Sequence, residues 1–254
     1  MTFDVAAEAY DRFMGRYSVK LSPQLIDLAG VAVGQKVLDV GCGPGALTGA
    51  LVARLGSDAV AAVDPSESFV AAARERHPGV DVRSAFAEQL PFADETFDAA
   101  LAQLVVHFMS DPVAGLREMG RVTVRGGVVA ACVWDFSGGQ GPVSVFWRAA
   151  REFDPDAGDE SELAGTRPGH LAELMTAAGL GAVEEATLEV SSEFETFDEW
   201  WEPFTLGVGP AGAYGAGLDA ASQAKVRERC RQLLPEAPFA LRVRTWAARG
   251  VVRV

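Results

Sequence analysis

Short apolar runs alternate with helical hydrophobic patterns along the first half of the chain. This alternation is typical of βαβ units, in which parallel strands are joined by helices that cover the sheet. The apolar runs predict strands at residues 36–40, 59–63, 80–84, 97–103 and 127–134. The helical patterns between them predict helices at residues 46–55, 66–76 and 113–122. We therefore expect an α/β fold built around a mostly parallel sheet.

The second half of the chain has a different pattern. Residues 167–178 are predicted to form a helix and residues 183–190 a strand. Residues 239–245 alternate apolar side chains with arginines, which is typical of an antiparallel strand near a sheet edge with one solvated face. The segments at about 135–165 and 195–235 fall outside the alternation of strands and helices. We expect these two segments to form a helical cap.

The beginning of the chain predicts a helical cover over about residues 1–33. Its helical pattern runs from Phe3 to about Ala29. Ser22 followed by Pro23 suits the cap and the first position of a helix, so we expect a second helix to begin there. The length suits one α/β domain with an appended cap. We therefore predict a single domain over all 254 residues.

Composition and charge restrict the possible partners. The chain carries 35 acidic and 22 basic residues, a net charge of −13 that repels phosphate backbones, so we expect no nucleic-acid partner. The longest apolar run, residues 128–133, is far shorter than the roughly 20 residues of a membrane helix. Asp4 and Glu8 do not suit a signal peptide. The three cysteines are widely spaced and odd in number, which favours a cytoplasmic protein with neither a disulfide framework nor a metal site. We expect a monomer or a homodimer.

A loop with three glycines, Gly41, Gly43 and Gly45, follows the first predicted strand and precedes a predicted helix. Glycine permits positive φ and lets a ligand lie against the main chain. In open parallel sheets, ligands bind beyond the carboxyl ends of the strands. Asp64 follows the second predicted strand about twenty residues later, where a carboxylate can accept hydrogen bonds from ribose hydroxyls. These features predict a ligand that contains a ribose.

Two classes of ribose-containing ligand remain possible at this point. A dinucleotide fingerprint requires a third glycine, but Thr48 and Ala46 occupy the two candidate positions. Pro44 also removes one N–H donor that could hold a pyrophosphate. A ligand with a ribose and no phosphate, such as S-adenosylmethionine, fits better. A nicotinamide-dependent oxidoreductase stays as the less favoured alternative.

Several segments in order along the chain resemble a known family. They are residues 37–45, 63–66, 87–92, 94, 97–98 and 117–127. In them the chain is similar to the class I S-adenosylmethionine-dependent methyltransferases, in particular the small-molecule, type 11-like branch. The resemblance is dense over about residues 4–135 and looser over 169–179. It implies a Rossmann-like, seven-stranded, mostly parallel sheet with an antiparallel last strand. It also implies in-line methyl transfer to O, N or C of a small-molecule acceptor.

The resemblance implies a set of cofactor-binding positions. These are Tyr10, Arg16, Asp39, Gly41, Cys42, Gly43, Gly45, Asp64, Pro65, Phe86, Ala87, Glu88 and Gln103. Asp39 would hold the cofactor amine or pin the loop. Tyr10 and Arg16 would bind the cofactor carboxylate or cover the sheet as part of an amphipathic helix. The chain departs from the family at Phe86, where relatives carry an acidic residue for the adenine amino group; here Phe86 and the backbone of Ala87 would contact the adenine.

His107 is the candidate general base, because it follows the fourth predicted strand at the mouth of the expected cleft. A histidine that only shapes this loop is the other interpretation. His77 and His170 are expected to be exposed and without a role. A protein that binds S-adenosylmethionine without catalysis, as a regulatory or scaffold subunit, remains an alternative function.

Aromatic residues near the cap are candidates for the acceptor pocket, because rigid rings offer a large contact surface. They are Trp134, Trp200, Trp201 and Tyr214. Packing in the core of the cap is the equally open alternative. Residues 207–212 repeat a Gly-x-Gly-x-x-Gly pattern, but no strand precedes them, so we predict a flexible loop.

Overall fold

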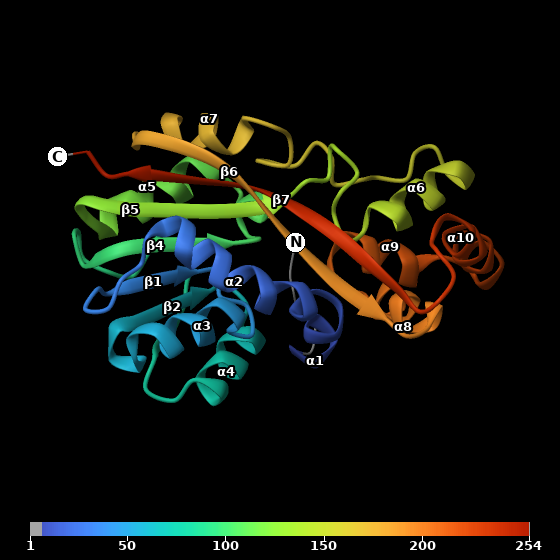
Figure 1. Ribbon diagram of the computed structural model, residues 1–254, viewed down its shortest axis with the longest axis horizontal. Helices are drawn as coiled ribbons and strands as arrows, with labels where there is room; N and C mark the ends of the chain where they lie inside the picture. Colours follow the sequence, from blue (N-terminus) through green and yellow to red (C-terminus); the bar gives the residue numbers. More distant parts are fainter. Residues whose placement is uncertain (1–6, 254) are drawn as a thin grey trace.

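The computed structural model describes residues 7–253, and the elements are arranged around one seven-stranded sheet (Figure 1). The strands are β1 (Val37–Val40), β2 (Val60–Asp64), β3 (Asp81–Ser84), β4 (Phe97–Gln103), β5 (Thr123–Trp134), β6 (Gly181–Phe194) and β7 (Phe239–Val251). Their order across the sheet is β3-β2-β1-β4-β5-β7-β6. Strand β7 is antiparallel to both of its neighbours, and the pairs from β3 to β5 are parallel. The predicted α/β fold, with its mostly parallel sheet and antiparallel last strand, is confirmed.

Helices cover both faces of the sheet. On one face lie α2 (Arg16–Ala29), α3 (Ala46–Leu55) and α4 (Glu67–Arg76), and on the other lie α5 (Pro112–Val122) and α7 (His170–Ala177). Neighbouring residues of β1 divide between the two layers: Val37 packs toward α2 and α3, and Leu38 toward α5 and α7. This is the period of two expected for a strand buried on both sides. Among the described residues, no helix is long and apolar enough to cross a membrane.

The connection between β3 and β4 determines where a ligand can bind. The chain moves outward from β1 through β2 to β3 and then returns to the other side of β1 as β4. The loops after β1 and β4 therefore diverge at the carboxyl ends of these strands, which is the usual place of a ligand crevice in an open α/β sheet. Figure 1 shows the N-terminal helices lying alongside this end of the sheet.

The cap consists of helices that lie beyond the end of β6 and the start of β7 (Figure 1). They are α6 (Ser144–Phe153), α8 (Phe197–Trp201), the 3₁₀ turn η4 (Glu202–Thr205), α9 (Gly209–Gly217) and α10 (Ala220–Leu233). An aromatic core holds them together, in which Phe146 stacks on Phe204 with ring centroids 4.6 Å apart. The prediction of a flexible loop at 207–212 is wrong for most of its length, because α9 begins at Gly209 and packs against η4.

The N-terminal cover differs from its predicted form. A short helix α1 (Ala7–Tyr10) continues through a π-helical turn, η1 (Asp11–Gly15), into α2, and residues 3–6 of the predicted helix lie outside the described part. The predicted helix start at Ser22 and Pro23 is wrong, because α2 runs through both residues. Ser22 is fully buried and its hydroxyl donates to the carbonyl of Ser18 at 2.8 Å. Tertiary packing of the apolar face of α2 therefore outweighs the roughly 3 kcal/mol that an interior proline costs a helix.

Strand β7 extends six residues beyond the predicted end at residue 245. The added residues lie between β5 and β6, and both Ala247 and Ala248 are buried there. Because the sheet is covered on both faces at this point, the strand loses the apolar–polar alternation by which it was predicted. Pattern alone therefore identified only the solvated part of β7.

Candidate active site

A cleft of about 900 Å³ opens at the carboxyl ends of β1, β2 and β4. Of the predicted cofactor-binding residues, those that line it are Tyr10, Gly41, Gly43, Asp64, Pro65, Phe86, Ala87, Glu88 and Gln103. The sequence analysis did not include Phe69, Phe108 and Met109, which add apolar surface to the cleft. The structure thus brings together residues that are up to about a hundred positions apart in the sequence.

Each of the three loop glycines is required for a different physical reason. All three have positive φ, at +72° for Gly41, +52° for Gly43 and +99° for Gly45. A side chain at Gly41 would collide with Val105, and a side chain at Gly45 would meet the ring of His77 at 2.7 Å. At Gly43 the nearest side-chain atom is 4.0 Å away, on Tyr10. Gly43 is thus required by its backbone conformation alone, whereas Gly41 and Gly45 also make room for neighbouring side chains.

The expectation that His77 is exposed is wrong. It is partly buried against the loop, and its Nε2 lies 2.9 Å from the carbonyl oxygen of Gly45. His170 is partly buried as well, and its Nδ1 accepts a hydrogen bond from the backbone of Gly165 at 3.2 Å. Both histidines hold loop backbone in place, a role that needs tertiary contacts and leaves no pattern in the sequence.

Asp64 is held rigidly at the floor of the cleft. Its two carboxylate oxygens accept backbone N–H groups, one from Gly43 and one from Ser66, each at 2.9 Å. Burial raises the pKa of Asp64, and the two backbone hydrogen bonds act in the opposite direction. Each oxygen keeps a further lone pair, so the carboxylate can still accept hydrogen bonds from vicinal hydroxyls of a ligand.

Asp39 and Gln103, on the neighbouring strands β1 and β4, each keep one unpaired acceptor oxygen among the described residues. Asp39 on β1 pairs with Leu101 on β4, and Gln103 lies two residues beyond Leu101 on the same strand. Thr48 donates to Asp39 Oδ2 at 2.6 Å, and Gln103 donates to the carbonyl of Ser18 at 3.1 Å. Asp39 Oδ1 and Gln103 Oε1 are buried and have no partner among the described residues. Burial raises the pKa of Asp39 to about 7. A ligand ammonium group would satisfy both oxygens.

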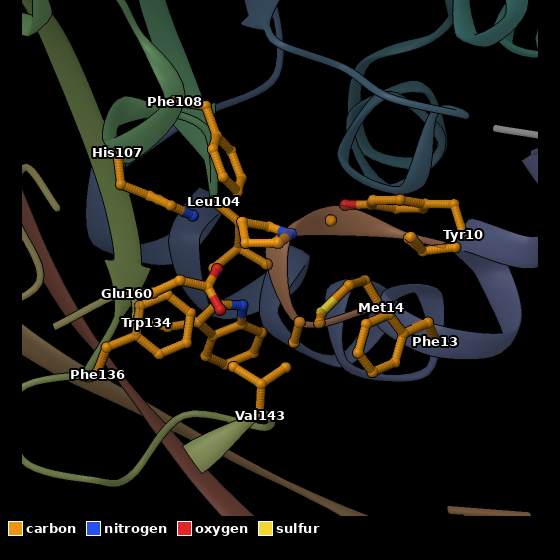
Figure 2. A pocket seen from close by; sticks show the side chains of 14 residues that line it. Tyr10, Phe13, Met14, Leu104, His107, Phe108, Trp134, Phe136, Val143 and Glu160 are labelled. Carbon is orange, nitrogen blue, oxygen red and sulfur yellow. The ribbon is translucent and has the colours of Figure 1, made fainter. Parts of the chain in front are cut away.

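A second, smaller cavity adjoins the cleft (Figure 2). Tyr10, Leu104 and Phe108 line both spaces and therefore form their common wall. Leu104 directly follows β4 and has a φ of +61°, an unusual value for a non-glycine residue that recurs at functional sites. The remaining lining is Phe13, Met14, His107, Trp134, Phe136, Val143, Glu160 and residues 208–211. The cavity is thus mainly apolar and aromatic.

His107 lies in a 3₁₀ turn, η3 (Val106–Phe108), directly after β4. The side chain is buried, and its Nδ1 has no hydrogen-bond partner among the described residues. Burial lowers the pKa of His107 to about 3, so the imidazole is neutral at physiological pH. Figure 2 shows its ring directed into the cavity. A neutral, unpartnered imidazole can accept a proton from a bound molecule.

Glu160 is the acidic side chain that lines this cavity (Figure 2). It comes from the segment between α6 and α7, and the indole N–H of Trp147 donates to its Oε2 at 2.8 Å. Burial raises the pKa of Glu160 to about 7. The sequence analysis missed this residue because 135–165 carries no motif. A single acid in a segment of irregular pattern gives no signal until the fold places it beside a cavity.

Comparison with known proteins identifies the family and the fold. Residues 38–131 match the family model of a methyltransferase domain. A phosphatidylethanolamine N-methyltransferase from Cereibacter sphaeroides is 33% identical over 162 residues, covering 61% of this chain and 77% of that protein. The YcgJ protein of Bacillus subtilis has a TM-score of 0.62 at 19% identity, with 94% and 99% of the two chains covered. The chain belongs to the class I S-adenosylmethionine-dependent methyltransferases, type 11 branch.

Coverage of the relatives is uneven. A malonyl-[acyl-carrier protein] O-methyltransferase from Erwinia billingiae is 35% identical over 127 residues, 50% of this chain and 49% of that protein. The chain thus spans about half the length of several curated relatives that it matches. The cofactor of this methyltransferase family is S-adenosylmethionine, and the large cleft, here called the cofactor cleft, has groups that fit it. Asp64 suits its ribose, and the free oxygens of Asp39 and Gln103 suit its ammonium group. The smaller space is called the acceptor cavity below.

Four predicted cofactor residues are not among those that line the cofactor cleft: Arg16, Asp39, Cys42 and Gly45. Arg16 makes an ion pair with Glu199 at 3.0 Å and lies over the ring of Phe194 at 4.4 Å, so it joins α2 to the cap. Cys42 is buried with Val70 and other side chains beneath α4, and burial raises the pKa of its thiol. Both expectations are corrected, because the side chains point into packing that the linear motif does not contain.

Glu88 and Gly45 need a more limited correction. Glu88 lines the cleft, but its Oε1 accepts the backbone N–H groups of Ser110 and Asp111, at 2.7 and 3.2 Å. The side chain therefore fixes the loop before α5. Gly45 does not line the cleft; it caps α3 in the left-handed conformation. Both residues shape the site through the backbone.

Among the four predicted acceptor-pocket aromatics, only Trp134 lines the acceptor cavity. Trp200 and Trp201 are buried in the aromatic core of the cap, where Trp200 lies 4.8 Å from Phe204 between ring centroids. The hydroxyl of Tyr214 donates to Asp154 at 2.8 Å. The structure therefore supports the alternative interpretation, cap packing, for these three. The lining residues Phe13 and Met14 were missed, because their helical spacing predicts core packing.

Proposed function

We propose that this chain transfers the methyl group of S-adenosylmethionine to a small molecule held in the acceptor cavity. The adjacency of the two spaces carries the proposal: Tyr10, Leu104 and Phe108 line both. When bound, the cofactor supplies a methyl group on a cationic sulfur, which is an excellent leaving group. The chain then needs chiefly to align the acceptor with that methyl group and to exclude water.

In the cofactor cleft, Asp64 would accept the ribose hydroxyls, while Asp39 and Gln103 would take the ammonium group. Phe86, whose side chain is 65% exposed, would cover the adenine in place of the acidic residue of its relatives. Burial of this exposed ring against a flat base is favourable, because it removes apolar surface from water. Apolar contact therefore replaces one hydrogen bond at this position.

In the acceptor cavity, His107 would accept the proton that an O–H or N–H acceptor loses during transfer. Its buried, neutral imidazole is in the protonation state that a base requires at pH 7. The phenylalanine and methionine side chains around it exclude water, so that the methyl group reacts with the bound acceptor. This role is local to the acceptor cavity and needs no contact with the cofactor cleft.

Ligand-dependent melting tests the proposal directly. S-adenosylhomocysteine at 100 times its Kd should stabilise the fold by about 2.7 kcal/mol, and NADH should not stabilise it. Stabilisation by NADH alone would overturn the cofactor assignment. Binding of S-adenosylhomocysteine without methyl transfer to any offered acceptor would support the non-catalytic alternative instead.

A further inference from the structure

The charges around the acceptor cavity are unbalanced. None of the described residues that line it is a lysine or an arginine, and its histidine, His107, is neutral. Glu160 is the lining carboxylate, and it is 5% exposed. The cavity therefore holds one acidic group and, within the described part of the chain, no cation to balance it.

The neighbours of Glu160 leave its charge unpaired. Its Oε2 accepts the indole N–H of Trp147, and no ion pair joins it to any of residues 7–253. The adjacent acid, Asp159, takes the nearby cation, Arg151, as its own partner. Glu160 also lines an outer hollow with Arg148 and Arg151, and no ion pair joins it to either arginine. A buried carboxylate without a cation is costly, so a cationic ligand at this place would be stabilising.

The walls around Glu160 suit a cation with an apolar body. Trp134, Phe136 and Phe108 offer ring faces, and Phe13 and Met14 add apolar surface (Figure 2). Aromatic faces attract ammonium groups, most strongly where water is excluded. An anion would meet an uncompensated carboxylate, and a neutral molecule would leave that carboxylate unpaired. Both the apolar walls and the unpaired carboxylate therefore favour a cationic ligand with an apolar body.

We propose that the methyl acceptor is an amine on an apolar body, and that Glu160 binds its ammonium group; this inference rests on the proposed function. The bound ammonium gives one proton to His107, the base of the proposed function, and becomes a neutral amine, while the Glu160 carboxylate offsets the positive charge. The lone pair of the amine nitrogen then forms the new N–C bond as the C–S bond breaks, and that electron pair remains on sulfur. The product is a methylated ammonium, and His107 releases its proton to water. Atoms and charges balance without a further reactant.

The test compares three probes of similar shape: 2-phenylethylamine, 2-phenylethanol and 3-phenylpropionate. Each is titrated calorimetrically into protein saturated with S-adenosylhomocysteine. The amine should bind about tenfold more tightly than the alcohol, or better, and the carboxylate should bind least. Equal or tighter binding of the alcohol or the carboxylate, or no binding of the amine, would overturn the proposal.

Two matched variants test whether the preference for the amine depends on Glu160. Glu160→Gln keeps an acceptor for the Trp147 indole but removes the charge, so it should abolish the preference for the amine. Asp159→Asn removes the same charge one residue away and should leave the preference unchanged. An equal loss in both variants would show a general electrostatic effect and contradict a site at Glu160. Unchanged S-adenosylhomocysteine affinity in Glu160→Gln shows that the variant is folded. Failure of that ligand to bind the parent protein would instead refute the proposed function.

Discussion

In the cofactor cleft the ligand-facing groups come from the ends of adjacent parallel strands, whereas in the acceptor cavity they come from segments scattered over the chain. Two polar groups of the cleft, Asp64 and Gln103, are the last residues of β2 and β4, the two neighbours of β1. The acceptor cavity combines Phe13 from the N-terminal cover, His107 after β4 and Glu160 between α6 and α7. The cleft is therefore built on the ends of neighbouring strands, and the cavity on the packing of separate elements around them.

Because the two sites are built differently, substitutions in them should have different effects. In the cleft, backbone N–H groups fix the carboxylate of Asp64, so its role depends on loop geometry. Among the described residues of the acceptor cavity, His107 has an unpartnered Nδ1 and Glu160 accepts one hydrogen bond, from Trp147, so burial determines the pKa of both groups. Variants in the two places should therefore affect binding of the cofactor and turnover separately.

The largest expected effect is that of His107→Ala, which should lower the rate and leave cofactor affinity nearly unchanged. His107→Ala should lower the rate of methyl transfer about 10²- to 10⁴-fold, the usual contribution of a general base. The affinity for S-adenosylhomocysteine should remain within about twofold, because His107 does not line the cofactor cleft. Single-turnover kinetics and calorimetry measure the two quantities. His107→Asn, which retains a polar side chain, controls for lost packing; equal loss of rate and cofactor affinity would favour the structural interpretation of His107.

Asp64→Ala should have the opposite effect to His107→Ala, with weaker cofactor binding and a nearly unchanged rate. Loss of its ligand hydrogen bonds should weaken S-adenosylhomocysteine binding by about 1–3 kcal/mol, with little change of rate at saturating cofactor. Isothermal titration calorimetry measures the affinity. Asp81→Asn is the control, because this exposed acid lies on the neighbouring strand β3 and pairs with Arg83 outside the cleft. Unchanged affinity in Asp64→Ala would refute the ribose role.

A smaller effect links cofactor binding to protons through Asp39. Its folded pKa of about 7 lies above the ordinary value of 3.8, so the unbound protein takes up a proton there between these pH values. Stability from this group is therefore greatest below pH 3.8 and falls as the pH rises toward 7. An ammonium beside Asp39 favours the ionised carboxylate, so cofactor binding near pH 6 should release up to about one proton.

Calorimetry in buffers of different ionisation enthalpy measures this proton release. Asp39→Asn should remove it, although Asp64 and Tyr10, which interact electrostatically with the same region, remain in place. Release that persists in Asp39→Asn would assign the proton to one of these neighbours. Thr48→Val is a useful companion variant, because it removes the hydroxyl that donates to Asp39 and should raise the pKa further.

The smallest expected effect is at Arg16. Arg16→Ala should change S-adenosylhomocysteine affinity by less than about twofold and stability by less than about 1 kcal/mol, because its partly exposed ion pair with Glu199 contributes little. Thermal melts with and without ligand measure both. Glu199→Gln should have a comparable effect on stability. A tenfold loss of affinity in Arg16→Ala alone would restore the predicted contact with the cofactor carboxylate.

The sequence predicted the strands of the first half closely, and β4 to the residue. It placed the start of β5 four residues late, at 127 where the strand begins at Thr123, and it divided α2 at Pro23. Both errors have one cause: edges and breaks were inferred from local chemistry, and packing against the sheet extended the elements past them. Trp200, Trp201 and Tyr214 failed as cavity residues for a related reason, since an aromatic in a cap packs into a core or faces a cavity with the same local pattern.

By itself the sequence determined the α/β fold, the glycine loop and the acid after β2, because these depend on period, backbone conformation and short spacing. The tertiary structure alone decided that Arg16 faces the cap, that Asp39 and Gln103 keep free oxygens, and that Glu160 borders an apolar cavity. These facts arise from side chains that meet across long sequence separations. Burial then sets their charge and pKa, and burial is a property of the folded neighbourhood rather than of the residue.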